Sequence, residues 1–147
     1  IPLLREFLYL SIFVPEGQPP LPREILDTPE FQVYVRNFGE EPHDCALVAE
    51  AEGQVVGAAW ARIMEDYGHL DEHTPSLAIA LLPSCRGQGW GEQLLQSLLE
   101  LLQARGESGV SLSVQRENRR AVNLYRKLGF AVAVDKGEEY VMRKELR

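Results

Sequence analysis

An arginine and three glycines lie within six residues of this sequence, in the segment Arg86-Gly87-Gln88-Gly89-Trp90-Gly91. A glycine has no Cβ atom, so its backbone can approach a ligand closely and adopt a positive φ. A loop that opens a helix points backbone N–H groups outward, and the helix N-terminus adds partial positive charge. Arg86 would add a full charge and a forked donor. The segment therefore predicts a polyphosphate site, and a glycine-rich turn without a ligand is the alternative.

The spacing of the glycines argues against two common phosphate-binding motifs. A P-loop requires GxxxxGK[ST], and no lysine in this chain is followed by serine or threonine. A dinucleotide-binding fingerprint requires GxGxxG, whereas the third glycine here, Gly91, comes one residue too early. A dinucleotide-binding oxidoreductase is therefore disfavoured.

The elements that must position this segment can be predicted from hydrophobic periodicity and from the helix and turn signals. We expect helices at 3–13, 23–38, 90–105 and 118–128, the second of them interrupted at Asp27-Thr28-Pro29. Apolar runs predict strands at 45–51, 55–63, 77–82, 110–114, 130–134 and 140–144. This order favours an α/β or α+β fold with a mixed sheet, in one domain over residues 1–147.

Composition narrows the class of protein. The formal net charge of −7 disfavours non-specific nucleic-acid binding; it fits a cationic partner such as an amine, or it serves only to keep the protein soluble. The two cysteines, Cys45 and Cys85, form no CxxC or Cys/His cluster, so neither a metal site nor a disulfide framework is expected. Without a signal peptide or a membrane-spanning run, we expect a cytoplasmic protein. Because the chain opens at Ile1-Pro2, we expect that a further segment, with a first strand, precedes it.

A second motif follows the glycine segment. Asn118 is followed seven residues later by Tyr125 and then by Leu128-Gly129-Phe130. Together with the pattern R/Q-x-x-G-x-G/A at 86–91, this resembles the GNAT superfamily of N-acetyltransferases, and the likeness covers nearly the whole chain. The resemblance implies a mostly antiparallel central sheet flanked by helices, acetyl-coenzyme A (acetyl-CoA) as cosubstrate, and two strands that splay where it binds.

The resemblance also implies a role for individual residues. The pantetheine arm would pair with the backbone of residues 79–81. The pyrophosphate would lie on the backbone of 87–92, and Tyr125 would lie near the thioester sulfur. The implied contacts with the cosubstrate are Ile79, Ala80, Leu81, Arg86, Gly87, Gln88, Gly89, Trp90, Gly91, Glu92 and Asn118.

The chemistry of acetyl transfer assigns candidate roles. A free thiol has a pKa of about 8.5 and a tyrosine a pKa of about 10, so Tyr125 could act as the general acid for the departing sulfur; a packed helix residue is the alternative. Asn118 could equally be an ordinary helix N-cap, and both of its roles can coexist.

The general base is open. Many GNAT proteins carry an acidic residue where this chain has Ser76. Candidates for a base that acts through water are Asp71, Glu72, His73 and His69. Alternatively, the amine binds partly neutral and needs no strong base.

Five basic residues surround the last predicted helix and could bind coenzyme A phosphates or form a solvated face: Arg116, Arg119, Arg120, Arg126 and Lys127. The leading hypothesis is an N-acetyltransferase for a primary amine of a small molecule or peptide. The alternative is a GNAT-like sensor or interaction module that binds acyl-coenzyme A without turnover. The sequence leaves the oligomeric state open, with a homodimer as one option.

Overall fold

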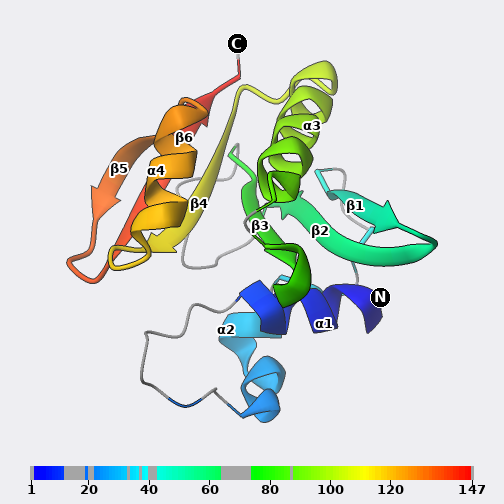
Figure 1. Ribbon diagram of the computed structural model, residues 1–147. Helices are drawn as coiled ribbons and strands as arrows, with labels where there is room; N and C mark the ends of the chain where they lie inside the picture. Colours follow the sequence, from blue (N-terminus) through cyan, green and yellow to red (C-terminus); the bar gives the residue numbers. More distant parts are fainter. Residues whose placement is uncertain are drawn as a thin grey trace.

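The computed structural model describes residues 2–11, 19, 22–32, 34–36, 38–39, 43–63, 74–86 and 88–146. Its elements follow the chain in the order α1 (Pro2–Ser11), the 3-10 helix η1 (Arg23–Asp27), α2 (Pro29–Gln32), β1 (Cys45–Ala51), β2 (Gln54–Arg62), β3 (Ser76–Leu81), the 3-10 helix η2 (Pro83–Cys85), α3 (Trp90–Ala104), β4 (Gly109–Gln115), α4 (Arg119–Lys127), β5 (Ala131–Asp135) and β6 (Glu139–Glu145) (Figure 1).

The six strands form one mixed sheet in the order β1-β2-β3-β4-β6-β5. All neighbouring strands are antiparallel except β3 and β4, which are parallel. Strands β1 and β2 form an antiparallel hairpin, and its turn is made by Glu52 and Gly53, both at positive φ. The predicted fold class, a mostly antiparallel sheet flanked by helices, is therefore confirmed.

The interruption predicted at Asp27-Thr28-Pro29 is confirmed, whereas the helix predicted to resume as far as Phe38 is wrong, because α2 ends at Gln32. The chain forms η1, then the short α2, and then a turn at 34–36. Thr28 lies between the two helices with an extended backbone, at φ −76° and ψ 151°. A residue that precedes proline is pushed out of the helical region by the proline ring, and Pro29 follows here. The proline therefore separates η1 from α2 at the predicted interruption.

The parallel strands β3 and β4 meet at one point and then diverge. A single register pair joins them, Ser76 with Ser111. Both serines are fully buried, and the Ser111 N–H donates to the Pro75 carbonyl at 2.9 Å. From there β3 continues to Leu81 and β4 to Gln115 without a further pair. The predicted splay of these strands is thus present, and it opens toward their carboxyl ends.

Two hydrophobic clusters occupy opposite faces of the sheet. On one face, α3 packs against the sheet with Leu94, Leu95, Leu98, Leu99 and Leu102. On the other, α1 and η1 contribute Phe7, Leu8 and Leu26 around Trp60. Trp60 is fully buried, and its indole N–H donates to the Tyr34 carbonyl at 3.0 Å. The helices hold the sheet from both sides, which fixes the strand ends that border the splay.

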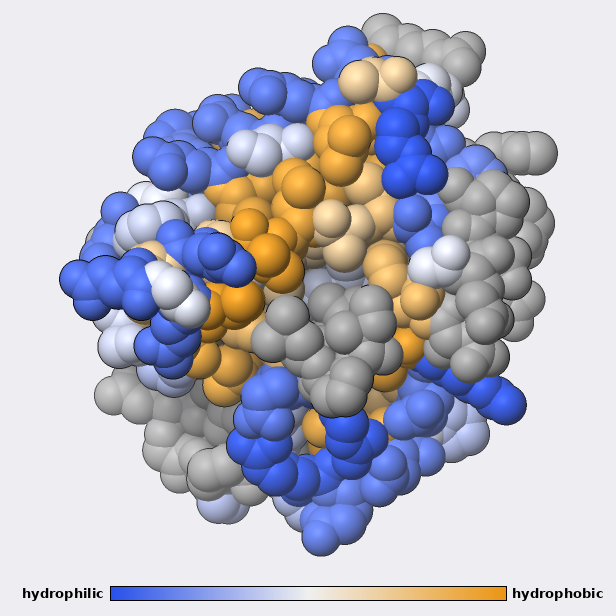
Figure 2. All heavy atoms as spheres, turned by 90° about the vertical axis from the view of Figure 1, so that its right-hand side faces the viewer, coloured by the Kyte–Doolittle hydropathy of each residue, from blue (hydrophilic) through white to orange (hydrophobic). Residues whose placement is uncertain are grey.

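The side of the molecule that carries β1 exposes apolar residues. Figure 2 shows them as a band bordered by hydrophilic residues. Val48 on β1, the first strand in the order of the sheet, is 45% exposed. None of the helices in the described part of the chain combines the length and apolar character needed to cross a bilayer.

Candidate active site

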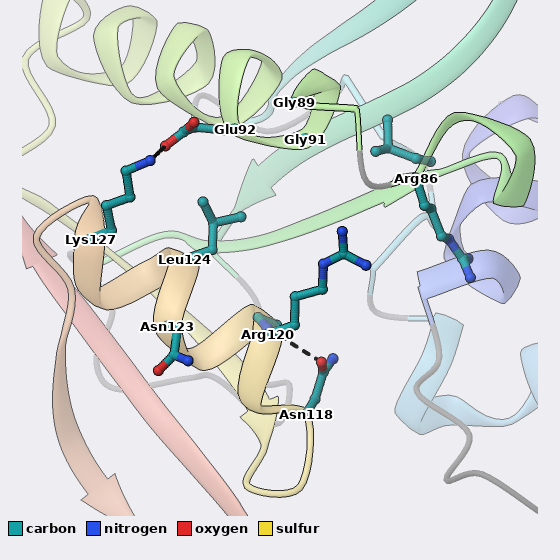
Figure 3. A pocket seen from close by; sticks show the side chains of 11 residues that line it. Arg86, Gly89, Gly91, Glu92, Asn118, Arg120, Asn123, Leu124 and Lys127 are labelled. Atoms are coloured by element: carbon teal, nitrogen blue, oxygen red, sulfur yellow. Dashed lines mark hydrogen bonds and ion pairs between the residues drawn. The ribbon is translucent and has the colours of Figure 1, made fainter.

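A pocket of about 580 Å³ lies between the N-terminus of α3 and the length of α4 (Figure 3). It sits where β3 ends, on the open side of the splay. Its described lining residues are Leu81, Arg86, Gly89, Gly91, Glu92, Asn118, Arg120, Ala121, Asn123, Leu124 and Lys127. The pocket therefore brings together the two motifs found in the sequence.

The glycine segment forms the α3 side of the pocket. Gly89 is the N-cap of α3, at φ +87°, a conformation that L side chains rarely adopt. Because the first N–H groups of a helix have no partner within the helix, this end of α3 offers several donors to a ligand. Gln88 steadies the loop by donating to the Ser84 carbonyl at 3.0 Å. Gly87 lies outside the described residues.

Strand β3 ends in this pocket with Leu81. Its side chain rests on Gly57 of β2, where an added Cβ would lie 2.4 Å from Leu81 Cδ2. Gly57 could not be identified from the sequence, because only the register between β2 and β3 places it opposite Leu81. The side chains of Ile79 and Ala80 do not line the pocket. Ala80 packs in the cluster around Trp60, on the face of the sheet that α1 covers.

Arg86 lies at the pocket but turns away from the glycine segment. Its guanidinium donates to the carbonyl of Leu10 at 3.0 Å, near the C-terminus of α1. Figure 3 shows the side chain directed toward that helix. A cation near a helix C-terminus is favourable, because the last carbonyls of a helix carry partial negative charge. In this arrangement Arg86 joins the loop to α1.

Helix α4 forms the opposite side of the pocket. Asn118 is its N-cap, and the side-chain oxygen accepts from the Ala121 N–H at 3.4 Å. The predicted capping role is therefore present. The amide NH2 group of Asn118 donates to none of the described residues and borders the pocket.

The structure separates the five basic residues that the sequence grouped around α4. Arg120 and Lys127 line the pocket, whereas Arg119 and Arg126 are exposed and do not. Arg116 lies over the Tyr140 ring, 5.2 Å from its centroid. Lys127 pairs with Glu92 of α3 at 2.7 Å, across the pocket. Arg120 makes no ion pair with any residue in the described part of the chain.

Tyr125 and Phe130 belong to the C-terminal cap of α4. The Phe130 N–H donates to the Tyr125 carbonyl at 2.9 Å and the Gly129 N–H to the Arg126 carbonyl at 3.1 Å. With Gly129 at φ +101°, this is a Schellman motif, which commonly adds an apolar contact between its outer residues. The two rings make that contact, with centroids 5.8 Å apart. The spacing Tyr125-x3-Gly129-Phe130 therefore has a structural cause that the sequence analysis missed.

The Tyr125 side chain is partly buried beside the cluster under α3. Burial raises the pKa of Tyr125 to about 12, because the ionised phenolate would lose hydration. Tyr125 does not line the pocket, although its neighbour Leu124 does. Its hydroxyl stays protonated throughout the neutral range.

The beginning of β3 carries no carboxylate. Ser76 is fully buried, and its hydroxyl lies 3.4 Å from that of Ser111. The base candidates Asp71, Glu72, His73 and His69 lie outside the described residues. No group of three or more potential metal ligands occurs among the residues that the structure describes.

Comparison with known proteins places this geometry in a family. The model of the Acetyltransferase (GNAT) family matches residues 9–130. The mycothiol acetyltransferase of Frankia alni is 37% identical over 96 residues, which cover 58% of this chain and 28% of that protein. A putative ribosomal protein bS18-alanine N-acetyltransferase of Bacillus subtilis is 33% identical over 90 residues, covering 61% of this chain and 56% of that protein.

The fold is also similar to a solved structure. The crystal structure of the ribosomal-protein-S18-alanine N-acetyltransferase from Escherichia coli superposes with a TM-score of 0.68 at 20% identity. The match covers 99% of this chain and 86% of that one. By contrast, the chain spans about a quarter to just over half of the curated relatives it matches in sequence. With the family model matched over most of its length, the chain belongs to the Acetyltransferase (GNAT) family.

Proposed function

We propose that this protein is an acetyl-CoA-dependent N-acetyltransferase that transfers the acetyl group to a primary amine by direct attack within a ternary complex. The observation that carries the proposal is the pocket at the splay of β3 and β4, bordered by the N-terminus of α3 and by Asn118. Membership of the GNAT family supports the same reaction, and the named relatives are acetyltransferases.

The residues present fit acetyl-CoA as the cosubstrate, which would supply an activated acetyl thioester. Residues 79–81 of β3 pair with β2 on one edge but with no strand on the edge toward β4, so their backbone groups there suit an extended pantetheine arm. The N–H groups at the start of α3 suit the pyrophosphate. The contacts with acetyl-CoA expected from the sequence, from Ile79 to Asn118, stay predictions at the level of individual residues.

Tyr125 is proposed to assist the departing sulfur. Because its pKa is raised to about 12, the Tyr125 hydroxyl stays protonated near neutral pH. Because a thiol ionises near pH 8.5, complete proton transfer from so weak an acid is unfavourable in the ground state. Tyr125 therefore acts mainly as a hydrogen-bond donor that stabilises negative charge as it develops on sulfur.

The acceptor is proposed to be a primary amine of a small molecule or a peptide. The bS18-alanine name of one relative gives a precedent for a peptide acceptor. The acidic net charge would favour a cationic acceptor. The cytoplasmic location and the homodimer stay predictions.

A second function, an acyl-coenzyme A sensor without turnover, is favoured by one observation. Ser76, where many family members carry an acid, is fully buried and hydrogen-bonded within the protein. Its hydroxyl does not ionise near neutral pH, so it offers no ready base.

One experiment separates the two functions. The protein is titrated with acetyl-CoA, coenzyme A and NAD⁺, and then incubated with acetyl-CoA and a panel of amines while free thiol is measured. Micromolar binding of the two coenzyme A compounds, with amine-dependent thiol release, supports the enzyme. Binding without release for any amine supports the sensor, and no binding of either compound contradicts both. The Tyr125→Phe variant should lose rate but keep its affinity for acetyl-CoA.

A further inference from the structure

We propose that Arg120 of α4, and not Arg86 of the glycine segment, is the side chain that binds the pyrophosphate of acetyl-CoA. This inference rests on the proposed function, since it assigns a ligand contact within the same pocket. It reverses the assignment that the sequence pattern favours, in which Arg86 supplies the charge.

The cations that line the described part of the pocket are in three different situations. Arg86 donates to the Leu10 carbonyl and is directed toward α1. Lys127 is paired with Glu92 at 2.7 Å. Arg120 has no ion-pair partner among the described residues. Moving Arg86 or Lys127 onto a phosphate would break an existing interaction, whereas Arg120 has no ion pair with a described residue to lose.

The position of Arg120 suits the pyrophosphate. It lies on α4 one turn before Leu124 and two turns before Lys127, so these three side chains share one face of the helix. In Figure 3 the Arg120 side chain extends from α4 toward the loop that carries Gly89, across the pocket from the first turn of α3. A phosphate on the α3 N–H groups would then be contacted by backbone from one side and by a guanidinium from the other.

The charge of the α3 terminus makes this second contact useful. Glu92 lies in the first turn of α3. Its carboxylate stabilises the helix when no ligand is bound, but it repels a bound anion. Lys127 neutralises Glu92 through their ion pair and therefore adds little net attraction for a ligand. Arg120 supplies the uncompensated positive charge, and its planar fork matches two phosphate oxygens.

Arg86 is then a positioning residue. Its bond to Leu10 ties the loop before the α3 N-cap to α1, so it influences the ligand only through the place of the loop. Loss of the Arg86 side chain should weaken the binding of every ligand that uses the loop backbone. It should not change how strongly binding depends on salt.

The test compares Arg120→Gln, Arg86→Gln and the control Arg119→Gln, an exposed arginine of the same helix that does not line the pocket. Each protein is titrated with coenzyme A and with dephospho-coenzyme A, which keeps the pyrophosphate but lacks the 3′-phosphate. The change in fluorescence of the half-buried Trp90, beside Gly89 and Gly91, reports binding. Thermal unfolding checks that each variant is folded.

We expect Arg120→Gln to lower the affinity for both ligands equally, by about 10- to 100-fold, which is the range for a lost hydrogen bond to a charged group. Its binding should also depend less steeply on salt than that of the wild type, and Arg119→Gln should bind like the wild type. A loss confined to coenzyme A would place Arg120 at the 3′-phosphate and overturn the proposal. A flatter salt dependence in Arg86→Gln, with none in Arg120→Gln, would also overturn it. If the wild type binds neither ligand, the proposed function itself fails.

Discussion

The two helices that border the pocket are held in place by different interactions. Helix α3 has 15 residues and buries five leucines against the sheet. Helix α4 has nine residues, and only Val122 among them is buried. Its ends are fixed instead, by the Asn118 N-cap and by the Schellman motif at Gly129. Packing therefore holds α3, and capping makes a larger contribution to α4.

This difference in anchoring corresponds to the chemical groups that each helix presents to the pocket. Helix α3 presents backbone, and a row of N–H groups needs a fixed helix axis to stay aimed at one point. Helix α4 presents side chains, among them Asn118 and Arg120, whose reach tolerates small movements of the axis. The caps of α4 coincide with the residues of the second sequence motif. Each of the following substitutions tests this contrast between packing and capping.

The largest effect is expected from Leu95→Ala in α3. Leu95 is fully buried, so the variant loses apolar contacts and leaves a cavity, which costs about 2–5 kcal/mol of unfolding free energy. Urea unfolding measures the loss, with the exposed Gln96→Ala of the same helix as control. A loss below about 1 kcal/mol would show that packing does not dominate the anchoring of α3.

The two helices also show which features of the structure could be predicted from the sequence. The leucine spacing of 90–105 predicted α3 and its buried face, because a period near 3.6 reports which side of a helix meets a core. The strand predictions succeeded because short apolar runs indicate buried strands, and 45–51 was predicted with the bounds that β1 has. Patterns within one element are visible in the sequence.

Relations between elements were not visible. The sequence grouped Arg119 with Arg120, and only the rotation of α4 against α3 places one at the pocket and the other in solvent. The direction of Arg86 depends on where α1 ends, many residues away. Gly57 matters only because the strand register places it opposite Leu81.

A second effect is expected at high pH from Tyr125 on α4. Below pH 10 the tyrosine is protonated in both the folded and the unfolded protein and contributes no pH dependence. Between pH 10 and about 12 only the unfolded form ionises, so stability falls as pH rises; above that the loss levels off. Two pKa units set a limit near 3 kcal/mol, and partial exposure of the ring lowers the expected loss to about 2 kcal/mol.

Tyr125→Phe should abolish this loss, since phenylalanine cannot ionise. Chemical unfolding at several pH values between 9 and 12 measures the difference in slope, and Tyr140→Phe, which retains Tyr125, serves as control. Equal slopes for the wild type and Tyr125→Phe would mean that the hydroxyl is hydrated in the folded protein.

Gly129→Ala tests the C-terminal cap of α4. At φ +101° a Cβ is strained, which costs about 1–2 kcal/mol, and it would also displace the Lys144 side chain. The matched change Gly91→Ala lies at the other helix, where among the described residues a Cβ would meet only Leu81 Cδ1 at 3.4 Å, an ordinary contact. Thermal unfolding should show a clear loss for the first variant and almost none for the second. Equal losses would contradict the distinction.

Asn118 gives the smallest effect on stability and the finest separation of two roles. Asn118→Ala removes the N-cap and should cost about 1 kcal/mol, whereas Asn118→Asp keeps an oxygen acceptor and should cost a few tenths. For acetyl-CoA the order is different, because both variants lose the amide donors and the aspartate adds a negative charge to an anion pocket. The aspartate variant should therefore be almost as stable as the wild type but bind acetyl-CoA more weakly than the alanine variant, as measured by calorimetric titration. If it binds like the wild type, Asn118 serves α4 only as a cap, and the contact with the cosubstrate falls to Arg120 and the backbone of α3.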